Sequence, residues 1–173
     1  MPEGYTVRRV RISDADRVRS IRIESLGDPA ADIAFLGSRE RALAQPTEFW
    51  QERTAAVALS GSAAQFVAES GREWFGTVTV LIAEPTGSDS TAASRPSLVA
   101  VYVRPSQRGR GILEAMVDAA AAWVGDAGGT ELALEVHEDN VRARRAYERL
   151  GFVPTGRSSE GPNGTEHEMV RRL

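Results

Sequence analysis

The hydrophobic and polar positions of this chain change period several times, and each change marks a predicted element. Apolar residues at every second position indicate strands with one buried face, and apolar residues three or four apart indicate amphipathic helices. In the first third of the chain, the pattern predicts a strand at 7–12, a helix capped by Ser13 or Asp14 and ended by Gly27, and further helix at 33–60 that is strongest at 47–59 with Thr47 as its cap. Strands at 64–70 and 72–84 follow, joined by a tight turn at Ser70 and Gly71. The remaining elements are a strand at 97–103, a helix at 112–127, a strand at 130–136, a helix at 140–150, a turn at 151–156 leading into a short strand, and a last strand at 166–173.

Residues 85–96 are small and polar, with no periodicity. Strand-like segments flank them on both sides, and neither half of the chain would hold a full core alone. A flexible loop between neighbouring strands therefore fits better than a domain linker, and a lid over a site is the less favoured alternative. With 173 residues, 42% of them hydrophobic, the chain is expected to form a single domain over 1–173.

Composition excludes several classes of function. The formal net charge of -3 argues against general affinity for nucleic acid or an anionic membrane. No apolar run is long enough to span a bilayer, and the first ten residues lack the apolar core of a signal peptide, so we expect a cytoplasmic protein. The chain has no cysteine, which excludes disulfides, thiolate nucleophiles and zinc-thiolate sites, and we predict no metal site. Every basic residue is arginine, which removes any phosphate-loop or Schiff-base lysine.

The sequence SQRGRG at 106–111 lies between a predicted buried strand and a predicted helix. The first amide groups of a helix have no internal partners, and the helix dipole leaves partial positive charge there. Glycines let a ligand approach the backbone, while Arg108 and Arg110 add positive charge. This turn is typical of a cradle for phosphate or pyrophosphate, built on Gly109 and Gly111. The alternative is an ordinary tight turn with solvated arginines.

Two nucleotide-binding motifs fit this turn less well. A nucleotide phosphate loop needs a lysine that the chain lacks. A dinucleotide fingerprint could begin at Gly109 and Gly111, but Glu114 then occupies the third glycine position. Both alternatives are weakened.

A second constellation follows at residues 137–152. Asn140 is a good helix cap, Ala143 and Tyr147 lie on one apolar face, and Gly151 is placed to end the helix in a left-handed conformation. A structural explanation accounts for each residue taken alone, with Asn140 as a cap and Tyr147 as a core tyrosine.

Taken together, the two segments resemble the GNAT superfamily of acetyl-CoA-dependent N-acetyltransferases, from about Leu98 to Phe152. The shared pattern is a strand, Arg108-x-x-Gly111, a helix, a strand, and then Asn140-x-x-Ala143-x-x-x-Tyr147. The resemblance implies an α/β (α+β) fold with a mixed, mostly antiparallel sheet of about six or seven strands, flanked by about four helices and with splayed central strands.

The resemblance also implies a set of cofactor-binding positions for acetyl-CoA. The strand backbone would bond the pantetheine arm, the turn amides would hold the pyrophosphate, Asn140 would contact the pantetheine, and the Tyr147 hydroxyl would lie near the thioester sulfur. Tyr147 would then protonate the departing thiolate as the catalytic acid. The positions are Val101, Val103, Arg108, Gly109, Arg110, Gly111, Leu113, Asn140, Ala143 and Tyr147.

The chain departs from the family in two places. Leu113 stands where the family usually has glycine or alanine, and we expect altered cofactor affinity rather than lost binding. The central strand starts with Arg95-Pro96-Ser97, where the family often has an acidic general base. Glu24, Glu135 and His137 are the open candidates for the base.

The resemblance predicts transfer of an acetyl group to a primary amine of a small molecule or of a peptide or protein N-terminus. A catalytically inactive acyl-CoA sensor is the alternative, favoured by the absent strand carboxylate and opposed by Tyr147. A protein-interaction module with an ordinary glycine turn would bind no such ligand. The resemblance leaves pairing into a homodimer open.

Overall fold

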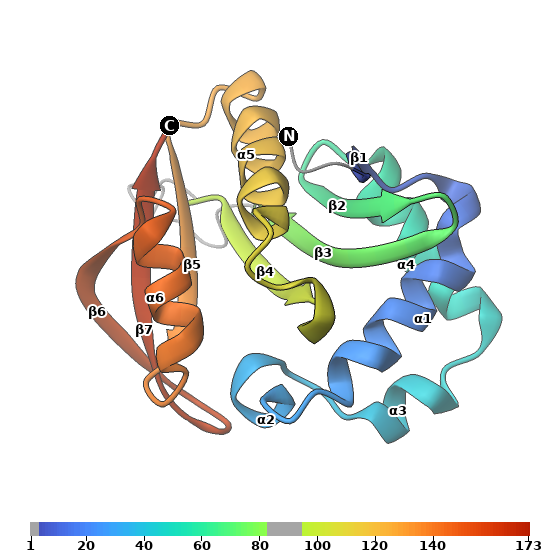
Figure 1. Ribbon diagram of the computed structural model, residues 1–173, viewed down its shortest axis with the longest axis horizontal. Coiled ribbons are helices and arrows are strands. Elements are labelled where there is room, and N and C mark those ends of the chain that lie inside the picture. The colour runs from blue at the N-terminus through green and yellow to red at the C-terminus, as the bar shows by residue number, and fades with distance from the viewer. Residues whose placement is uncertain (1–3, 83–94) are drawn as a thin grey trace, which may run out of the picture.

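The computed structural model describes residues 4–82 and 95–173, which form a seven-stranded sheet (Figure 1). The strand order is β1-β2-β3-β4-β5-β7-β6, and every neighbouring pair is antiparallel except β4 and β5. The strands are β1 (Thr6–Arg9), β2 (Ala63–Ser70), β3 (Glu73–Leu81), β4 (Ser97–Val103), β5 (Glu131–His137), β6 (Val153–Gly161) and β7 (Gly164–Arg172). Most of the loop predicted at 85–96 lies outside the described residues.

Helices cover both faces of the sheet. One buried cluster joins α5 and α6 to β2, β3 and β5, and a second joins α1 and α4 to the other face. Figure 1 shows α5 and α6 in front of the sheet. Among the described residues, no helix combines the length and apolar character needed to cross a membrane. The helices are α1 (Ala15–Leu26), α2 (Ala31–Ala34), α3 (Arg39–Ala44), α4 (Thr47–Leu59), α5 (Ile112–Asp126) and α6 (Val141–Arg149), with 3-10 turns at Ile12–Asp14 and Pro105–Gln107.

The sheet opens between β4 and β5. These parallel strands pair only at Ser97 with Ala133 and at Leu98 with Leu134. On its other edge β4 is irregular, because Thr77 of β3 pairs with Tyr102 while Thr79 pairs with Val99, which leaves β4 one residue longer over this interval. An extra residue of this kind bends and twists a strand. The two strands therefore diverge past Leu98, and the predicted splay is confirmed.

Ala100 lies inside this irregular segment with a φ of 51°. A left-handed conformation is uncommon for a residue with a side chain and is retained only where the surroundings fix it. Gly76 of β3 faces the same place, because a Cβ there would lie 2.6 Å from the Tyr102 carbonyl oxygen. The close approach of β3 to β4 thus depends on glycine at position 76.

Most predicted elements are confirmed, and several of their bounds are corrected. The stretch predicted as helix at 33–60 is divided into α2, α3 and α4, because Phe35 and Gln45 are extended and Gln45 precedes a proline that disfavours helix before it. Proline occupies the N-cap position of α4, so Thr47 is its first helical residue and not its cap. These breaks raise the number of α-helices above the expected four.

Further corrections concern the first strand and the turn between β2 and β3. The first strand ends at Arg9, and Ile12 belongs to a 3-10 turn with 55% of its surface exposed. The tight turn between β2 and β3 is one residue later than expected, since Ser70 still pairs with Glu73. Neither change moves the elements that surround the cleft.

Candidate active site

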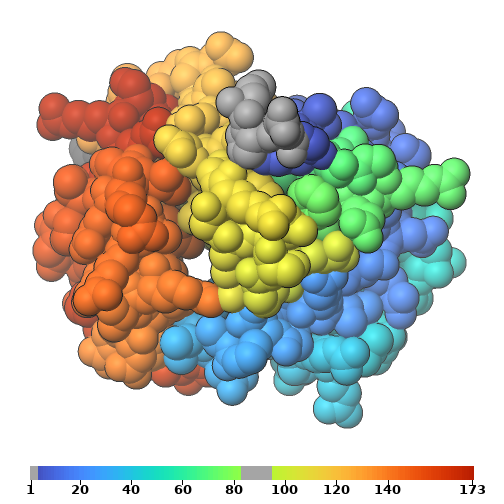
Figure 2. Space-filling model, in the orientation of Figure 1, coloured from blue at the N-terminus to red at the C-terminus, as the bar shows by residue number. Residues whose placement is uncertain are grey.

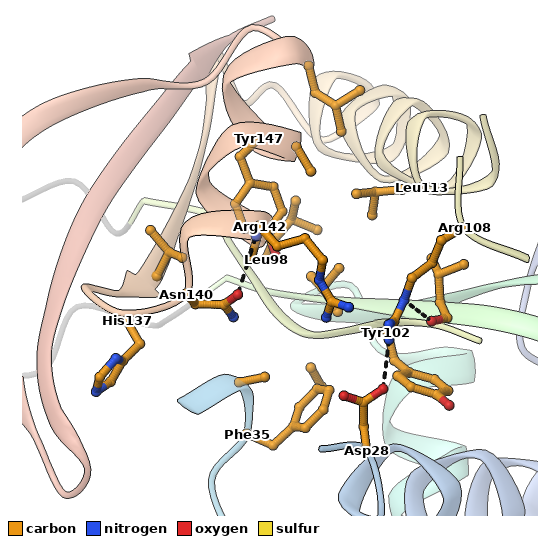
Figure 3. Close-up of a pocket in the computed structure, with 18 of the residues that line it drawn as sticks. Asp28, Phe35, Leu98, Tyr102, Arg108, Leu113, His137, Asn140, Arg142 and Tyr147 are labelled. Atoms are coloured by element: carbon orange, nitrogen blue, oxygen red, sulfur yellow. Dashed lines mark hydrogen bonds and ion pairs between the residues drawn. The ribbon is translucent and has the colours of Figure 1, made fainter. Parts of the chain in front are cut away.

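A cavity of about 470 Å³ occupies the opening between β4 and β5 (Figure 3). Its walls come from β4, the turn before α5, α6, β5, β7 and the segment around α2. Figure 2 shows an opening on the surface between the yellow turn that precedes α5 and the orange segment around α6. The strand at 97–103 was expected to be covered on both faces, but Val99 is 36% exposed and lines this cavity. The apolar strand is therefore partly a cavity wall.

The glycine-arginine turn forms one end of the cavity. Gly109 and Gly111 both have a φ of 76°, and α5 begins directly after Gly111 with no side-chain cap. A side chain at either position would be strained by the left-handed backbone. The turn thus presents the amide end of a 15-residue helix to the cavity, next to Leu113 in its first turn. Such a helix end attracts anions.

The two arginines of this turn lie in different places. Arg108 lines the cavity, but its guanidinium donates to the Val103 carbonyl oxygen at 2.9 Å and pairs with Asp28 at 2.7 Å. The Asp28 side chain is only 4% exposed. Arg110 is exposed, lies outside the cavity lining and donates to Gln107 at 3.3 Å. Any attraction for phosphate at this turn therefore depends first on the helix end, because Arg108 is already paired.

Helix α6 supplies the second cavity wall. Asn140 accepts a hydrogen bond from the Ala143 amide at 3.3 Å, so the predicted cap is confirmed, and Gly151 has the expected left-handed φ of 87°. The cap uses the carboxamide oxygen of Asn140 and leaves its amide nitrogen toward the cavity (Figure 3). Ala143 and Tyr147 line the same wall.

Tyr147 combines a core position with a place in the cavity. It is 8% exposed, and its ring meets that of Phe152 edge to face at 5.9 Å. Its hydroxyl has no hydrogen-bond partner among the described residues, and burial raises the pKa of the phenol above its usual value. Tyr147 thus keeps its proton at neutral pH, in a position where a ligand in the cavity would be the natural partner.

Of the three candidate bases, Glu24 is already engaged. Its carboxylate pairs with Arg104 at 2.7 Å and accepts a hydrogen bond from the Tyr102 hydroxyl at 3.1 Å. It does not line the cavity. Burial, followed by the negative charge of Glu24, raises the pKa of Tyr102 to about 12. Glu24 therefore fixes Tyr102 in the wall and is poorly placed to accept a proton from a ligand.

His137 lines the cavity, yet both of its ring nitrogens are used. The Asp139 amide donates to Nδ1 at 3.1 Å, so Nε2 carries the proton and donates to the Asn163 carbonyl oxygen at 2.8 Å. Glu135 lines the cavity two residues earlier on β5 and accepts a hydrogen bond from Ser159. Among the candidates, Glu135 has the accessible acceptor atoms.

Glu166 of β7 also lines the cavity, and the sequence analysis missed it. Burial first, and then the charge and hydrogen bond of Glu135, raise the pKa of Glu166. The signal that could have found it is strand alternation near the C-terminus, because β7 pairs with β5 and brings Glu166 opposite His137. That pairing spans about thirty residues and is invisible to short motifs.

Comparisons with known proteins agree with this architecture. The family model described as "Acetyltransferase (GNAT) family" matches residues 32–152. An acetyltransferase of the GNAT family from Streptococcus pneumoniae superposes with a TM-score of 0.76 at 16% identity, covering 98% of this chain and 99% of that chain. The yncA protein of Salmonella typhimurium, whose structure contains its cofactor acetyl-CoA, superposes with a TM-score of 0.74 at 17% identity, covering 99% of this chain and 95% of that chain.

These superpositions show that the chain shares the overall fold of both acetyltransferase structures. The chain belongs to the acetyltransferase (GNAT) family. An aminoglycoside N(6')-acetyltransferase type 1 from Stenotrophomonas maltophilia is 39% identical over 56 residues, which are 32% of this chain. The chain spans 37% of the length of that curated relative.

Proposed function

We propose that this protein transfers the acetyl group of acetyl-CoA to a primary amine by direct attack of the amine. The single observation that carries the proposal is the cavity between the diverging strands, which has a helix amino end at one side and the Tyr147 hydroxyl at the other. Acceptors in the predicted class are small molecules and peptide or protein N-termini. The aminoglycoside acetyltransferase relative supports an amine acceptor.

The residues present fit acetyl-CoA, which would supply the acetyl group as an activated thioester. The amides at the start of α5, from Gly109 and Gly111 to Leu113, suit the pyrophosphate. The backbone of Val101 and Val103 lies along the opened edge of β4, where a chain of amide groups could bond to it. Across the cavity, Asn140 offers its amide nitrogen to the same chain.

Leu113 narrows this end of the cavity without closing it. Its side chain is half-buried and lies in the cavity lining, while its amide belongs to the first turn of α5. Backbone recognition of the pyrophosphate therefore remains available. We expect the leucine to adjust affinity rather than abolish binding.

The protein's own groups can carry both proton transfers. Glu135, or a water held by it, takes the proton of the attacking amine as the N–C bond forms. A backbone amide between Val101 and Val103 stabilises the charge on the carbonyl oxygen. Tyr147 donates its proton to the sulfur as the C–S bond breaks, and its phenolate regains a proton from solvent. No covalent intermediate on the protein is needed.

The carboxylates of the cavity also affect the case for the alternative function, a catalytically inactive acyl-CoA sensor. That alternative drew support from the absence of an acidic residue at Arg95-Pro96-Ser97. Glu135 and Glu166 supply carboxylates to the cavity from other strands, so the missing strand carboxylate no longer favours inactivity. We retain catalysis as the proposal.

Thermal unfolding with and without acetyl-CoA tests cofactor binding first, with NADH and ATP as control ligands. A ligand at 100 times its dissociation constant adds about 2.7 kcal/mol to the free energy of unfolding. For a domain of this size the midpoint should rise by about 5–10 °C. Release of free thiol from acetyl-CoA in the presence of amines then separates an enzyme from a sensor. No midpoint shift with saturating acetyl-CoA would overturn the proposal.

A further inference from the structure

The unpaired charges that line the cavity differ in sign between α6 and the strands. Helix α6 contributes Arg142 and Arg149, while near the start of α5 the charge of Arg108 is offset by its partner Asp28, and Glu114 adds a negative charge. On the strand side, β5 and β7 contribute only acidic and neutral groups, with Glu135 and Glu166 as the charged ones. The arginines of α6 suit the phosphates of a nucleotide cofactor, and the acidic strand side is left for the other reactant.

Glu135 and Glu166 form a close pair on the sheet face that carries α1 and α2. Their neighbours Leu134 and Val136 point into the opposite core with α5, so strand alternation turns Glu135 and His137 away from it. Glu166 pairs with His137 across the ladder and is within hydrogen-bonding reach of Glu135. Glu166 is half-buried and Glu135 is exposed. Two neighbouring carboxylates repel each other unless a proton or a cation lies between them.

Among the described residues, the strands contribute no arginine or lysine to the cavity lining, and His137 is the basic group beside Glu166. Both ring nitrogens of His137 are hydrogen-bonded, to the Asp139 amide and to the Asn163 carbonyl group. Gly164 holds the hairpin tip against this ring, since a Cβ there would lie 2.7 Å from Nε2. The histidine is therefore held in the wall by both of its ring nitrogens.

This side of the cavity is closed by the α2 segment and by the β6–β7 hairpin. The Asn163 side chain donates to the Asp32 carbonyl oxygen at 2.6 Å and joins the two. Phe35 and Tyr102, in edge-to-face contact at 6.3 Å, form the facing aromatic wall. Phe35 and Glu166 also line a small neighbouring cavity of about 30 Å³ behind this wall. Glu166 thus lies on the closed side of the cavity, and Glu135 beside it is exposed.

An independent observation shows that the same cavity is built for a ligand. The Tyr147 side chain is more than nine-tenths buried, lines the cavity, and its hydroxyl has no hydrogen-bond partner within residues 4–82 and 95–173. Among the described residues, the buried side-chain atoms without a partner are those of Trp50 and Thr54, so the Tyr147 oxygen is accessible from the cavity and free to bond to a ligand that enters it. Tyr147 and the carboxylate pair line one continuous space.

We propose that Glu166, together with Glu135, binds the ammonium group of the acceptor and selects amines that carry no carboxylate beside the amine. This inference rests on the proposed acetyltransferase function and names its substrate class. An ammonium ion between the two carboxylates relieves their repulsion and forms charge-assisted hydrogen bonds. A carboxylate on the adjacent carbon enters the same chamber and meets like charge, with no arginine or lysine on this wall. Amino acids are therefore poor acceptors.

Three probes separate charge from size: 2-phenylethylamine, L-phenylalanine amide and L-phenylalanine. The last two differ in little more than the charge of one group. We expect kcat/KM for L-phenylalanine to be at least about 100-fold below that for its amide in the unaltered protein. The variant Glu166→Gln keeps the shape, raises KM for both cationic probes, and lowers the discrimination about tenfold or more. Equal use of L-phenylalanine and its amide overturns the inference.

Glu160→Gln is the matched control, because Glu160 lies on β6 in the same hairpin, is exposed and does not line the cavity. It should leave the ratio unchanged, and a ratio that changes equally in both variants counts against a specific site. Refusal of all three amines, with a normal midpoint shift by acetyl-CoA, overturns this inference and leaves cofactor binding intact. Absence of that shift overturns the proposed function itself.

Discussion

Replacing Tyr147 with phenylalanine removes one hydroxyl group and tests its role as the acid. The ring keeps its edge-to-face contact with Phe152, and no hydrogen bond to a described residue is lost. The free energy of unfolding should therefore change by less than about 0.5 kcal/mol. A change of that size moves the melting midpoint by less than about 2 °C. Stability and catalysis are thus separable at this position.

Turnover should fall about 100-fold in Tyr147→Phe. A positioned general acid contributes roughly 10²–10⁴ in rate, and burial raises the pKa of Tyr147, which makes the phenol a weak donor and favours the lower end of that range. A factor of 100 corresponds to about 2.7 kcal/mol of barrier. Free thiol release at saturating acetyl-CoA and amine gives kcat, and titration with acetyl-CoA gives the dissociation constant, which should change less than about threefold.

Tyr5→Phe provides the matched control. Tyr5 is half-buried against the core on the α5 side and lies outside the cavity lining. It should keep the kcat of the unaltered protein. If kcat of Tyr147→Phe stays within threefold of that value, the acid role is refuted, and a loss confined to acetyl-CoA affinity would make Tyr147 a binding residue.

Three further predictions concern stability and ionisation. Gly76→Ala should lower the free energy of unfolding by about 1–3 kcal/mol, because its Cβ would lie 2.6 Å from the Tyr102 carbonyl oxygen. Gly125→Ala, in open space on α5, should raise that free energy by about 0.4–1 kcal/mol, and denaturant unfolding compares the two variants. Asp28→Asn should cost about 1–3 kcal/mol at pH 7. Burial opposes ionisation of Asp28, but the Ala30 amide and Arg108 outweigh it and lower its pKa. The stabilisation is therefore present above about pH 4, and the difference between the two melting midpoints should shrink as pH falls below that. The pKa values of all three tyrosines are raised, that of Tyr102 to about 12. In the folded protein, fewer than half of the tyrosine side chains should therefore be ionised at pH 10, measured by absorbance at 295 nm, and half-ionisation at that pH would contradict this. The free energy of unfolding should fall as pH rises from 10 toward 12, because the unfolded tyrosines lose their protons first.

The strands and helices from 97 to 152 could be predicted because their signals are local. Asn140 caps its helix through the amide three residues ahead, and Gly151 has the left-handed backbone expected of it. These features depend on neighbours within one helical turn. The family prediction rested on this segment and is confirmed by the match over residues 32–152.

Features that depend on distant contacts could not be predicted. Arg108 was expected to face phosphate, yet its charge is paired with Asp28, eighty residues earlier in the chain. Arg110 was grouped with it, but the turn directs it away from the cavity. Glu166 reaches the cavity only through the pairing of β7 with β5. The roles of the cofactor-binding positions stay predictions, although all of them except Arg110 line the cavity.

The short contact between β4 and β5 gives this sheet two edges in its interior. Past Leu98 and Leu134 the two strands no longer pair with each other, so β4 carries an edge of the kind that most sheets have only at the rim. The strands before and after this gap belong to two subsheets joined by little backbone bonding. A ligand that bonds to the edge of β4 and contacts α6 would act as a missing strand between them. Loading the cavity would then change the mechanical continuity of the sheet as well as its chemistry.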